Sequence, residues 1–558
     1  MVKSSPKIEK TQGSSEELSL EDTGKRPRKA FRRHNREVWD WKSSNTSGSV
    51  LVELNSMCSS HVAYSYLANI ISVRGDLQIE AMVASPSKWA RVFLNGHRMV
   101  RRVLWSMVSP HFRVYRSFGA SDVIGPTVKG SRSRRRKARA VAGSFLSQVA
   151  SKTDFLVLRV ENVQVGDLIY DSFLAKYKVA TADLTSRQFQ DFFQQSLSDF
   201  IYWCDVFDSG RVQAVVVSHS VYSLAIPARV AISRGASAFV ANGAWVYSLS
   251  KKFLGTFRET AHYPSIAKQL DPSEIQAGCQ VASERLGRRL GGESGVDMPY
   301  SSGSSFDANH KDRVLPKTDK PKVVIVSHAF FDAPNARGVS LFPDFWEWLD
   351  FLADFSGSVD YDWFVKPHPD AGDDAAILDD FCDRHPEFTQ LPVSTSHHQL
   401  IRDGVTAVLS VYGTVGSELP LLGVPVINAS NNSFHEAYDF CFHADSVTAY
   451  EDLLRSIPSL PRPGPRERQK LLEFYFLHHI FTNKNLFFND WSKLWKKSNG
   501  RMVKATPRAY DIFLDAFSRE VHTDLVSRIS AFIDSHAYRL DGSGMLIPSK
   551  EHGLKVSR

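Results

Sequence analysis

The stretch between residues 361 and 429 constrains the fold of this chain more than any other. It opens with an apolar run, residues 361–365, that ends abruptly in the sequence Lys-Pro-His-Pro at 366–369. A second apolar run at 405–411 leads into a turn of small residues, a leucine-rich segment and a third short run at 424–428. Short apolar runs that alternate with amphipathic segments predict a parallel sheet with helices on both faces.

The Lys-Pro-His-Pro segment places a cation and an imidazole at the end of a predicted strand. Open α/β sheets bind ligands at the carboxyl ends of their strands, and proline stiffens the loop that carries Lys366, His368 and Pro369. We therefore expect these residues to contact a phosphate. Lys366 would neutralise its charge, and His368 would act as the catalytic group that donates a hydrogen bond or a proton to it. The alternative is a strand-ending turn in which His368 only caps the sheet.

The turn after the 405–411 run is a second candidate phosphate contact. Small residues ahead of a helix let phosphate reach the backbone N–H groups and the positive end of the helix dipole. Glu418, in the first turn of the predicted helix, could accept hydrogen bonds from ribose hydroxyls, or could only stabilise the helix. The candidate ligand-binding residues here are Ser410, Tyr412, Gly413, Thr414, Ser417 and Glu418.

The loop after the predicted strand at 322–327 carries more polar groups than a connector needs. His328, Asp332, Asn335 and Arg337 fall within it. Because this loop would face the cleft, we expect His328 and Asn335 to contact the ligand. A solvated loop is the alternative.

The N-terminal half offers candidates for a general base. If phosphate leaves on one side of a cleft, the group that deprotonates an acceptor hydroxyl must come from the other side. The candidates are Asp167, Asp171 and His219. Each also has a structural interpretation, since Gly166 and Asp167 together are typical of a turn, and a polar residue at the end of a strand, such as His219, often has a local partner.

Composition divides the chain into five parts. Residues 1–48, rich in Ser, Glu and Lys, predict a disordered basic arm, and residues 49–285 form an α/β domain on the acceptor side. Residues 286–321 are a linker rich in Gly, Ser, Asp and Lys. Residues 322–458 form a second α/β domain, and 459–558 a helical C-terminal extension. Two Rossmann-like domains that face a cleft suggest the GT-B architecture.

Within the first α/β domain the patterns also predict individual elements. Strands are expected at 50–54, 155–160 and 212–218, and helices at 61–71, 138–150 and 186–203.

A net charge of +8 and a pI near 9.0 favour anionic partners. Two basic segments, 25–33 and 132–139, could meet a phospholipid surface, a lipid-linked acceptor or RNA, or could be exposed loops. They lack the interleaved aromatic residues of nucleic-acid modules, so no specific nucleic acid is expected. Trp39 and Trp41, beside the first segment, fit an interfacial anchor.

The sequence gives no sign of membrane insertion or of disulfide bonds. No apolar run approaches the roughly 20 residues that span a bilayer, and the amino-terminal segment lacks the apolar core of a secretory signal. The five cysteines are scattered without paired spacing, which favours free thiols over zinc or disulfides. We expect a cytoplasmic protein, with peripheral association at the inner face of the cytoplasmic membrane as a further option.

These residues resemble bacterial surface-polysaccharide glycosyltransferases of capsule and lipopolysaccharide biosynthesis. The resemblance covers roughly residues 150–445 and rests on 166–171, the Ser218-His219 pair with Arg229 downstream, 366–369 and 410–425. The His-Pro pair is also similar to that of bacterial sialyltransferases, Kdo transferases and glycerophosphate polymerases, whose donors are CMP- or CDP-activated. The resemblance implies that His368 contacts the donor phosphate and that the turn at 410–418 binds the donor.

The implied activity is that of a glycosyltransferase, an enzyme that moves a sugar from a nucleotide-activated donor, CMP-linked in the favoured case, to a surface polysaccharide or glycolipid. No metal and no cofactor are expected, because the nearest Asp-x-Asp sequence, 360–362, lies at the start of its strand and not at the ligand-binding end. The expected partners are the nucleotide-sugar donor, a glycan or lipid-linked glycan acceptor and an anionic membrane surface. The alternatives are a CDP-glycerol-type polyol-phosphate transferase and a non-catalytic protein that binds membranes or nucleic acid through its basic segments.

Overall fold

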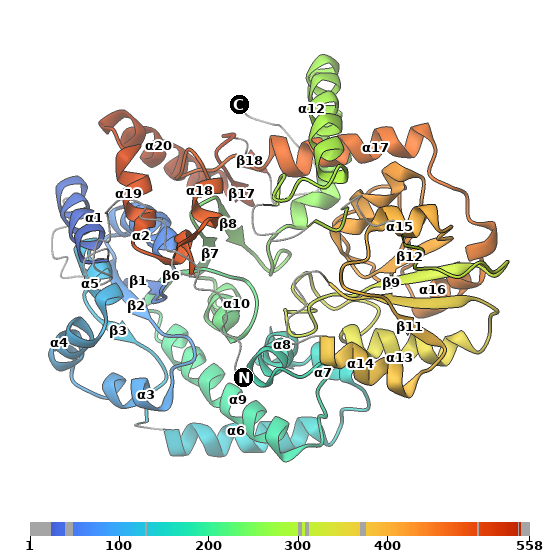
Figure 1. Ribbon diagram of the computed structural model, residues 1–558. Coiled ribbons are helices and arrows are strands. Elements are labelled where there is room, and N and C mark those ends of the chain that lie inside the picture. The colour runs from blue at the N-terminus through green and yellow to red at the C-terminus, as the bar shows by residue number, and fades with distance from the viewer. Residues whose placement is uncertain are drawn as a thin grey trace, which may run out of the picture.

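The computed structural model describes residues 24–39, 48–128, 131–298, 304–306, 312–368, 375–498, 501–544 and 546–547. These residues form two α/β domains that lie side by side (Figure 1). The first domain, on the left of Figure 1, contains the blue and green N-terminal half together with the red C-terminal segment. The predicted fold class of two Rossmann-like domains is therefore confirmed.

The first domain is built on a sheet with parallel middle strands and one antiparallel edge. Its strand order within the described residues is β18-β17-β8-β7-β6-β1-β2-β3. β1 is buried along its whole length, as a central strand covered on both faces must be, and its sequence Ser-Val-Leu-Val-Glu is accordingly apolar in the middle. The strands are β1 (Ser49–Glu53), β2 (Gln78–Met82), β3 (Val123–Ile124), β6 (Val212–Val217), β7 (Ser237–Ala241), β8 (Val246–Leu249), β17 (Arg539–Leu540) and β18 (Leu546–Ile547).

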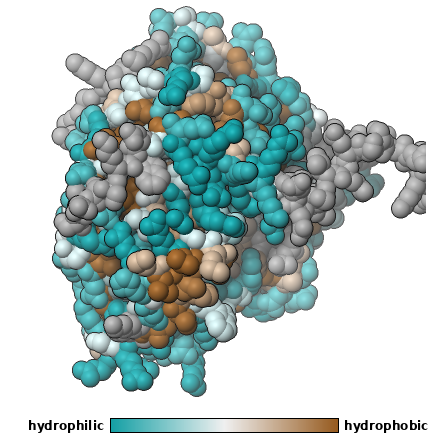
Figure 2. Space-filling view, turned by 90° about the vertical axis from the view of Figure 1, so that its left-hand side faces the viewer, coloured by the Kyte–Doolittle hydropathy of each residue, from teal (hydrophilic) through white to brown (hydrophobic). Residues whose placement is uncertain are grey.

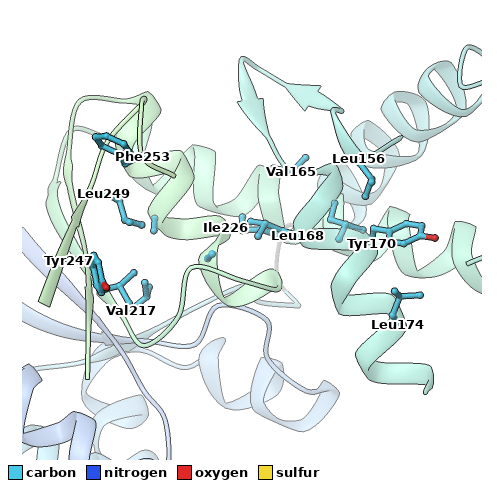
Figure 3. Close-up of a cluster of buried hydrophobic side chains, with 14 of the residues drawn as sticks. Leu156, Val165, Leu168, Tyr170, Leu174, Val217, Ile226, Tyr247, Leu249 and Phe253 are labelled. Atoms are coloured by element: carbon cyan, nitrogen blue, oxygen red, sulfur yellow. The ribbon is translucent and has the colours of Figure 1, made fainter. Parts of the chain in front are cut away.

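Helices cover both faces of this sheet. α2 (Cys58–Gly75) is buried around most of its circumference, because it lies against the sheet and also against α19 (Arg508–Asp515) and α20 (Arg519–Ser535). On the opposite face α8, α9 and α10 share one apolar cluster, and Figure 3 shows Leu168 of α8 beside Ile226 of α10. The other helices of this half are α1 (Lys25–Val38), α3 (Lys88–Leu94), α4 (Arg98–Val108), α5 (Pro110–Ser117), α6 (Ser131–Leu146), α7 (Lys152–Leu156), α8 (Gly166–Tyr177), α9 (Arg187–Asp208), α10 (Ile226–Ser233) and α11 (Tyr263–Ala267).

The second domain is a parallel, doubly wound sheet. Its order within the described residues is β11-β10-β9-β12-β13-β14, so the chain winds outward from β9 to β11 and then restarts at β12 on the other side of β9. A sheet of this order opens a crevice at the carboxyl ends of the strands that flank the reversal, here β9 and β12. The elements are β9 (Lys322–Val326), α13 (Phe345–Ser356), β10 (Asp362–Lys366), α14 (Ala375–Arg384), β11 (Phe388–Gln390), α15 (His397–Arg402), β12 (Ala407–Ser410), β13 (Val426–Asn428), β14 (Phe442–His443) and α16 (Val447–Arg455).

Two stretches of chain connect the domains. α12 (Pro272–Leu290) leads out of the first domain, and α17 (Pro465–Tyr475), which packs against α12, leads back towards it. The chain then adds α18 (Ser492–Trp495), α19 and α20 to the first domain, and β17 pairs with β8. The helices predicted beyond residue 459 are present, but this segment is not a separate extension because its last strands complete the first sheet.

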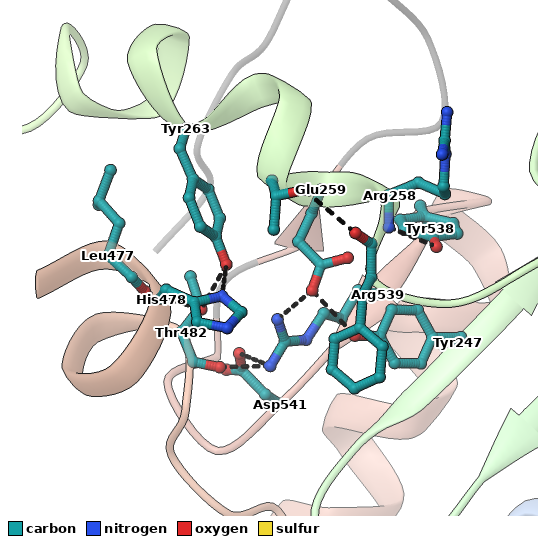
Figure 4. A network of polar contacts seen from close by, with 12 residues as sticks. Tyr247, Arg258, Glu259, Tyr263, Leu477, His478, Thr482, Tyr538, Arg539 and Asp541 are labelled. Carbon is teal, nitrogen blue, oxygen red and sulfur yellow. Dashed lines mark hydrogen bonds and ion pairs between the residues drawn. The ribbon is translucent and has the colours of Figure 1, made fainter. Parts of the chain in front are cut away.

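A buried arginine fixes this returning segment. Arg539 of β17 is 3% exposed, and its guanidinium lies 2.5 Å from Glu259 and 3.3 Å from Asp541 (Figure 4). The hydroxyl of Tyr247 on β8 also donates to Glu259, at 2.9 Å. The C-terminal strand is therefore held by charge as well as by its backbone ladder.

The structure corrects the prediction of a disordered arm for residues 25–38, whereas residues 1–23 and 40–47 of the predicted arm lie outside the described residues. Residues 25–38 form α1, and the side chain of Phe31 is fully buried, stacked on Tyr510 of α19 at a centroid distance of 4.6 Å. Trp39 packs against Tyr66 and His522, so it is not available as the interfacial anchor that the sequence suggested. Trp41 lies outside the described residues.

The strand predicted at 155–160 is also wrong over most of its length. A capping box between Ser151 and Asp154 starts α7 there, and only β4 (Arg159–Val160) is extended, in a hairpin with β5 (Val163–Gln164). Across the described ranges, none of the helices combines the length and hydropathy of a membrane-spanning segment.

Candidate functional site

A cavity of about 230 Å³ lies at the switch point of the second domain. The carboxyl ends of β9, β10 and β12 line it. The end of α12 forms another wall together with the interdomain segment, the residues between α12 and β9. Eight of the residues predicted from the sequence meet around this cavity: His328, Lys366, His368, Ser410, Tyr412, Gly413, Thr414 and Glu418.

Lys366 brings a positive charge into this cavity. The residue is 1% exposed, and its Nζ atom makes one long hydrogen bond, 3.5 Å, to the carbonyl oxygen of Pro367. Burial lowers the pKa of Lys366 from 10.5 to about 8, while the carboxylate of Glu418 acts in the opposite direction. Within the described residues no carboxylate forms an ion pair with this ammonium. An entering anion would supply the missing countercharge.

One imidazole organises the turn after β12. The backbone N–H of Val411 donates to Nε2 of His328 over 3.1 Å, so the neutral ring carries its proton on Nδ1. The hydroxyl of Ser410 also donates to Nε2, and its oxygen accepts the N–H of Gly413. Burial lowers the pKa of His328 to about 3, which keeps the ring neutral. A Cβ at position 413 would lie 2.9 Å from the Ser410 hydroxyl, so glycine is needed in this turn.

The segment after this turn is not the α-helix that the sequence predicted. Thr414–Ser417 and Leu419–Leu422 are short 3-10 turns, because Pro420 would fall in the interior of a helix that began at 414. The helix-dipole contribution expected for a phosphate is therefore small. Tyr412 stands at the start of the segment, where its hydroxyl donates to the carbonyl of Pro334 at 2.9 Å.

His368 follows β10 and is half-buried at the wall of the cavity. Its backbone N–H donates to the hydroxyl of Ser327 over 3.0 Å, which ties the ends of β10 and β9 together. Pro369, predicted beside it, lies outside the described residues.

Glu418 faces the cavity, but its carboxylate already has a partner. Nε of Arg289 lies 2.7 Å from its Oε1 atom, and the two side chains are 13% and 4% exposed. Arg289 stands in the last turn of α12. A ribose bound to Glu418, as the sequence suggested, would have to share the carboxylate with this guanidinium.

Sequence reasoning missed His397 and Arg289. His397 is the first residue of α15, its ring lies 4.9 Å from that of Phe306, and its Nδ1 has no hydrogen-bond partner among the described residues. Burial, with Lys366 nearby, lowers the pKa of His397 well below 6.5. The capping box between Ser396 and Gln399 was the available signal, since it places His397 at a helix start.

Five predicted residues of the described part do not line this cavity, and four of them, Asp167, Asp171, Asn335 and Ser417, are engaged elsewhere. Both oxygens of Asp167 accept hydrogen bonds from Arg229, at 2.6 and 2.7 Å. Asp167 lies in the first turn of α8 and not in the separate turn that the sequence suggested. Asp171, whose pKa burial raises, accepts the side-chain N–H of Asn335 at 2.8 Å. This contact joins α8 to the loop after β9 and so connects the two domains. The hydroxyl of Ser417 donates to a backbone carbonyl of its own turn.

His219 is exposed at the carboxyl end of β6 and is oriented by a buried carboxylate. Glu53, 4% exposed, accepts hydrogen bonds from the N–H of Ser218 at 2.6 Å and from its hydroxyl at 2.8 Å. Because the Ser218 hydroxyl proton points to Glu53, its oxygen accepts the Nδ1–H of His219, which lies 2.7 Å away. The neutral ring of His219 is then left with an unprotonated Nε2.

The first domain also contains a cluster of potential metal ligands. The ligand atoms of Cys58, His61 and His111 lie within 4.8 Å of one another. Both ring nitrogens of His61 are already engaged, Nδ1 with the hydroxyl of Tyr510 at 2.6 Å and Nε2 with the carbonyl of Asn55 at 3.1 Å. A metal ion bound by His61 would therefore have to displace one of these hydrogen bonds.

Comparison with known proteins finds remote structural likeness only. No family model matches the chain, and no curated protein matches its sequence. Among solved structures, the β-Kdo 2,4 transferase KpsC of Thermosulfurimonas dismutans matches with a TM-score of 0.27 and 11% identity, over 48% of this chain and 78% of that one. UDP-bound MnaA of S. aureus matches with a TM-score of 0.22 and 9% identity, over 76% and 91% of the two chains. UDP-GlcNAc 2-epimerase of Neisseria meningitidis, bound to UDP-GlcNAc, matches with a TM-score of 0.20 and 9% identity, over 77% of this chain and 96% of that one.

Proposed function

We propose that this protein is a glycosyltransferase that binds the phosphate of a nucleotide-activated sugar in the switch-point cavity and transfers the sugar to a surface glycan or glycolipid. The observation that carries the proposal is the buried ammonium of Lys366, which has no carboxylate partner among the described residues and lies where doubly wound sheets bind nucleotides. The resemblance of the Lys-Pro-His-Pro segment favours a CMP-linked donor.

Lys366 and His368 would act on the leaving nucleotide. As the bond between the sugar and the phosphate oxygen breaks, negative charge collects on the phosphate. The Lys366 ammonium stabilises this charge in a site that is largely shielded from water. His368, on the stiff loop beside it, donates a hydrogen bond or a proton to the departing oxygen. This arrangement supplies positive charge from the chain itself, so we expect transfer to be independent of added metal.

His219 is the base that this proposal favours among the candidates. Asp167 is paired with Arg229 and Asp171 with Asn335, whereas His219 is exposed and has an unprotonated Nε2. Nε2 would take the proton of the acceptor hydroxyl as that oxygen attacks the sugar carbon. Glu53 acts through Ser218 as a positioning residue, because it fixes the tautomer of the ring.

The binding half of the proposal is tested by thermal shift with CMP, CDP, UDP and GDP. A ligand that binds the folded state raises the unfolding temperature, and we expect at least one of these nucleotides to do so. Lys366→Met should abolish the shift, while Lys317→Met, an exposed lysine of the interdomain segment, should preserve it. No shift with any nucleotide in the wild-type protein would contradict the proposed cavity.

The catalytic half is tested by nucleotide release in the presence of an acceptor glycan. His368→Ala should abolish release while it leaves the fold intact, and wild-type activity should survive EDTA. Full activity in His368→Ala would refute the assigned role. A product that contains phosphate would favour the polyol-phosphate transferase over the glycosyltransferase.

A further inference from the structure

The segment from Lys88 to Ser117, which forms α3, α4 and α5, has an unusual composition. It contains seven lysines and arginines and no aspartate or glutamate. It also contains a group of apolar side chains that the fold leaves in solvent. Both features lie outside the cavity and the proposed catalytic residues.

The exposed apolar side chains lie on α3 and α4. Trp89 is 79% exposed, Met99 73% and Met107 72%, and Val92, Val100 and Val103 are each more than half exposed. Met99, Val103 and Met107 are spaced four residues apart and so form one stripe along α4. Soluble monomers rarely expose contiguous apolar patches of this kind without a partner.

The fold holds this stripe outward. The opposite side of the helix pair faces the domain, where Leu94 is 2% exposed and Arg101 forms an ion pair with the buried carboxylate of Asp122. Burying Met99 or Met107 in the same domain would require the helix to rotate away from that contact. The stripe is therefore a stable surface of the folded domain.

Arginines from three helices gather beside the stripe. Arg32 and Arg36 come from α1, Arg102 from α4, and Arg113 and Arg116 from α5. Burial and then the charge of Arg36 and Arg113 lower the pKa of Arg32, and burial with Arg102 and Arg36 lowers that of Arg116. No ion pair to a carboxylate is formed by these five side chains within the described part of the chain. The group is thus a concentration of positive charge that no carboxylate of the described residues pairs with.

Figure 2 shows the two features on one face of the molecule. It looks onto the left-hand side of Figure 1, where α1, α3, α4 and α5 lie, and an apolar area in its lower half is bordered above by hydrophilic atoms. A surface that combines an apolar stripe with cations on its border matches the interface of a bilayer, where acyl chains lie beneath charged headgroups.

We propose that this face docks on the surface of an anionic lipid bilayer, with Trp89, Met99 and Met107 inserted at the acyl boundary and the arginines of α1, α4 and α5 on lipid phosphates. A second copy of this chain is a poorer partner, because a symmetric contact would bring the arginine groups together and the 88–117 segment has no carboxylates to separate them. RNA is also a poorer partner, because its phosphates would bind the arginines but would leave the apolar stripe exposed to water.

The test is flotation of the full chain with vesicles of phosphatidylcholine alone and of phosphatidylcholine mixed with phosphatidylglycerol. We expect binding to the anionic vesicles only. Met99→Ser/Met107→Ser should lower vesicle affinity by about tenfold or more, and Arg102→Gln/Arg113→Gln by about fivefold for each charge removed. Val281→Ser/Val393→Ser and Arg187→Gln, which change exposed residues elsewhere, should bind like the wild type.

Three results would overturn the proposal. The first is no binding to anionic vesicles, and the second is binding that Met99→Ser/Met107→Ser leaves unchanged. The third is a dimer in solution, measured by light scattering, that the same variant converts to a monomer. Thermal shift with the four nucleotides should be equal in all variants, so a failure of membrane docking is distinguishable from a failure of the proposed nucleotide site.

Discussion

Arg289 and Glu418 form an ion pair of 2.7 Å in the wall of the cavity that holds Lys366. Arg289 belongs to the helix that leaves the first domain, and Glu418 to the turn after β12 in the second. The chain that joins the domains is therefore also a wall of the site, and a ligand in the cavity would contact both.

Removal of Arg289 should destabilise the protein strongly. Arg289→Met leaves the carboxylate of Glu418 buried without its partner, which typically costs about 3–5 kcal/mol. Urea unfolding would measure the loss, and Arg289→Met/Glu418→Leu should recover most of it. Arg288→Met is the matched control, because its pair with Glu293 is exposed to solvent and its loss should leave the stability nearly unchanged. Equal losses in the single and double variants would contradict this interpretation.

Lys366 should make the fold less stable at neutral pH. Its pKa is about 8 in the fold and 10.5 ordinarily, so the folded chain binds fewer protons than the unfolded chain between these values, and this contribution to stability rises with pH across that window. At pH 7 Lys366→Met should raise the free energy of unfolding by up to about 3 kcal/mol. Denaturation of the wild type and of Lys366→Met should show a smaller difference in the free energy of unfolding at pH 10 than at pH 7. A variant less stable at both pH values would refute the prediction.

Nucleotide affinity should fall as the pH rises through the pKa of Lys366. Only the protonated amine attracts phosphate, and in the free protein half of the Lys366 side chains are deprotonated near pH 8, the pKa of this group. Because a bound anion raises the pKa of the amine, dissociation constants measured by calorimetry should increase between pH 7 and pH 9. Lys366→Arg should remove this dependence, since arginine stays charged. An affinity that is flat with pH in the wild type would exclude Lys366 as the phosphate contact.

Ser218 should control the proton position on His219. Ser218→Ala removes the acceptor for Nδ1–H, so the tautomer with a free Nε2 is no longer favoured. Turnover should then fall by about tenfold or more while nucleotide affinity stays unchanged. Ser220→Ala, a buried serine two residues away, is the control. Unchanged turnover in Ser218→Ala would mean either that His219 is not the base or that Ser218 does not position it. Turnover in His219→Ala would distinguish the two, because loss of turnover there would keep His219 as the base.

Arg539 should be indispensable for folding of the first domain. Arg539→Met leaves Glu259 and Asp541 buried without their shared cation, at a cost of about 3–5 kcal/mol. Arg74→Met breaks an exposed pair with Asp534 on the same returning segment and should leave the stability nearly unchanged. Thermal unfolding would compare the two, and similar melting temperatures would contradict the prediction.

The second domain was predictable because its strands are buried on both faces. β9 and β10 show in the sequence as short apolar runs that end in polar residues, and this pattern located Lys366 and His368 at the edge where ligands bind. His328 and Ser410 followed from the same rule applied to β9 and β12.

Contacts between distant segments were not predictable from local pattern. Arg289 lies in the last turn of α12, where composition predicts the start of the linker, and nothing near it in the sequence indicates a contact with Glu418. The run at 155–160 is apolar, but the capping box of Ser151 and Asp154 favours helix over strand. β17 spans only Arg539–Leu540, too short for a period of two residues to appear, and its place in the first sheet depends on β8.

The pairing of β17 with β8 has a consequence for how the protein is made. Residues 322–458 leave the ribosome as a continuous unit, and the second domain can complete its sheet while synthesis continues. The first domain cannot complete its sheet at that stage, because α19 and α20, which cover α2, and the strand at its sheet edge follow the second domain in the sequence. The apolar face of α2 must therefore stay uncovered until these later elements have been synthesised, and this interval is when the nascent chain most needs a chaperone.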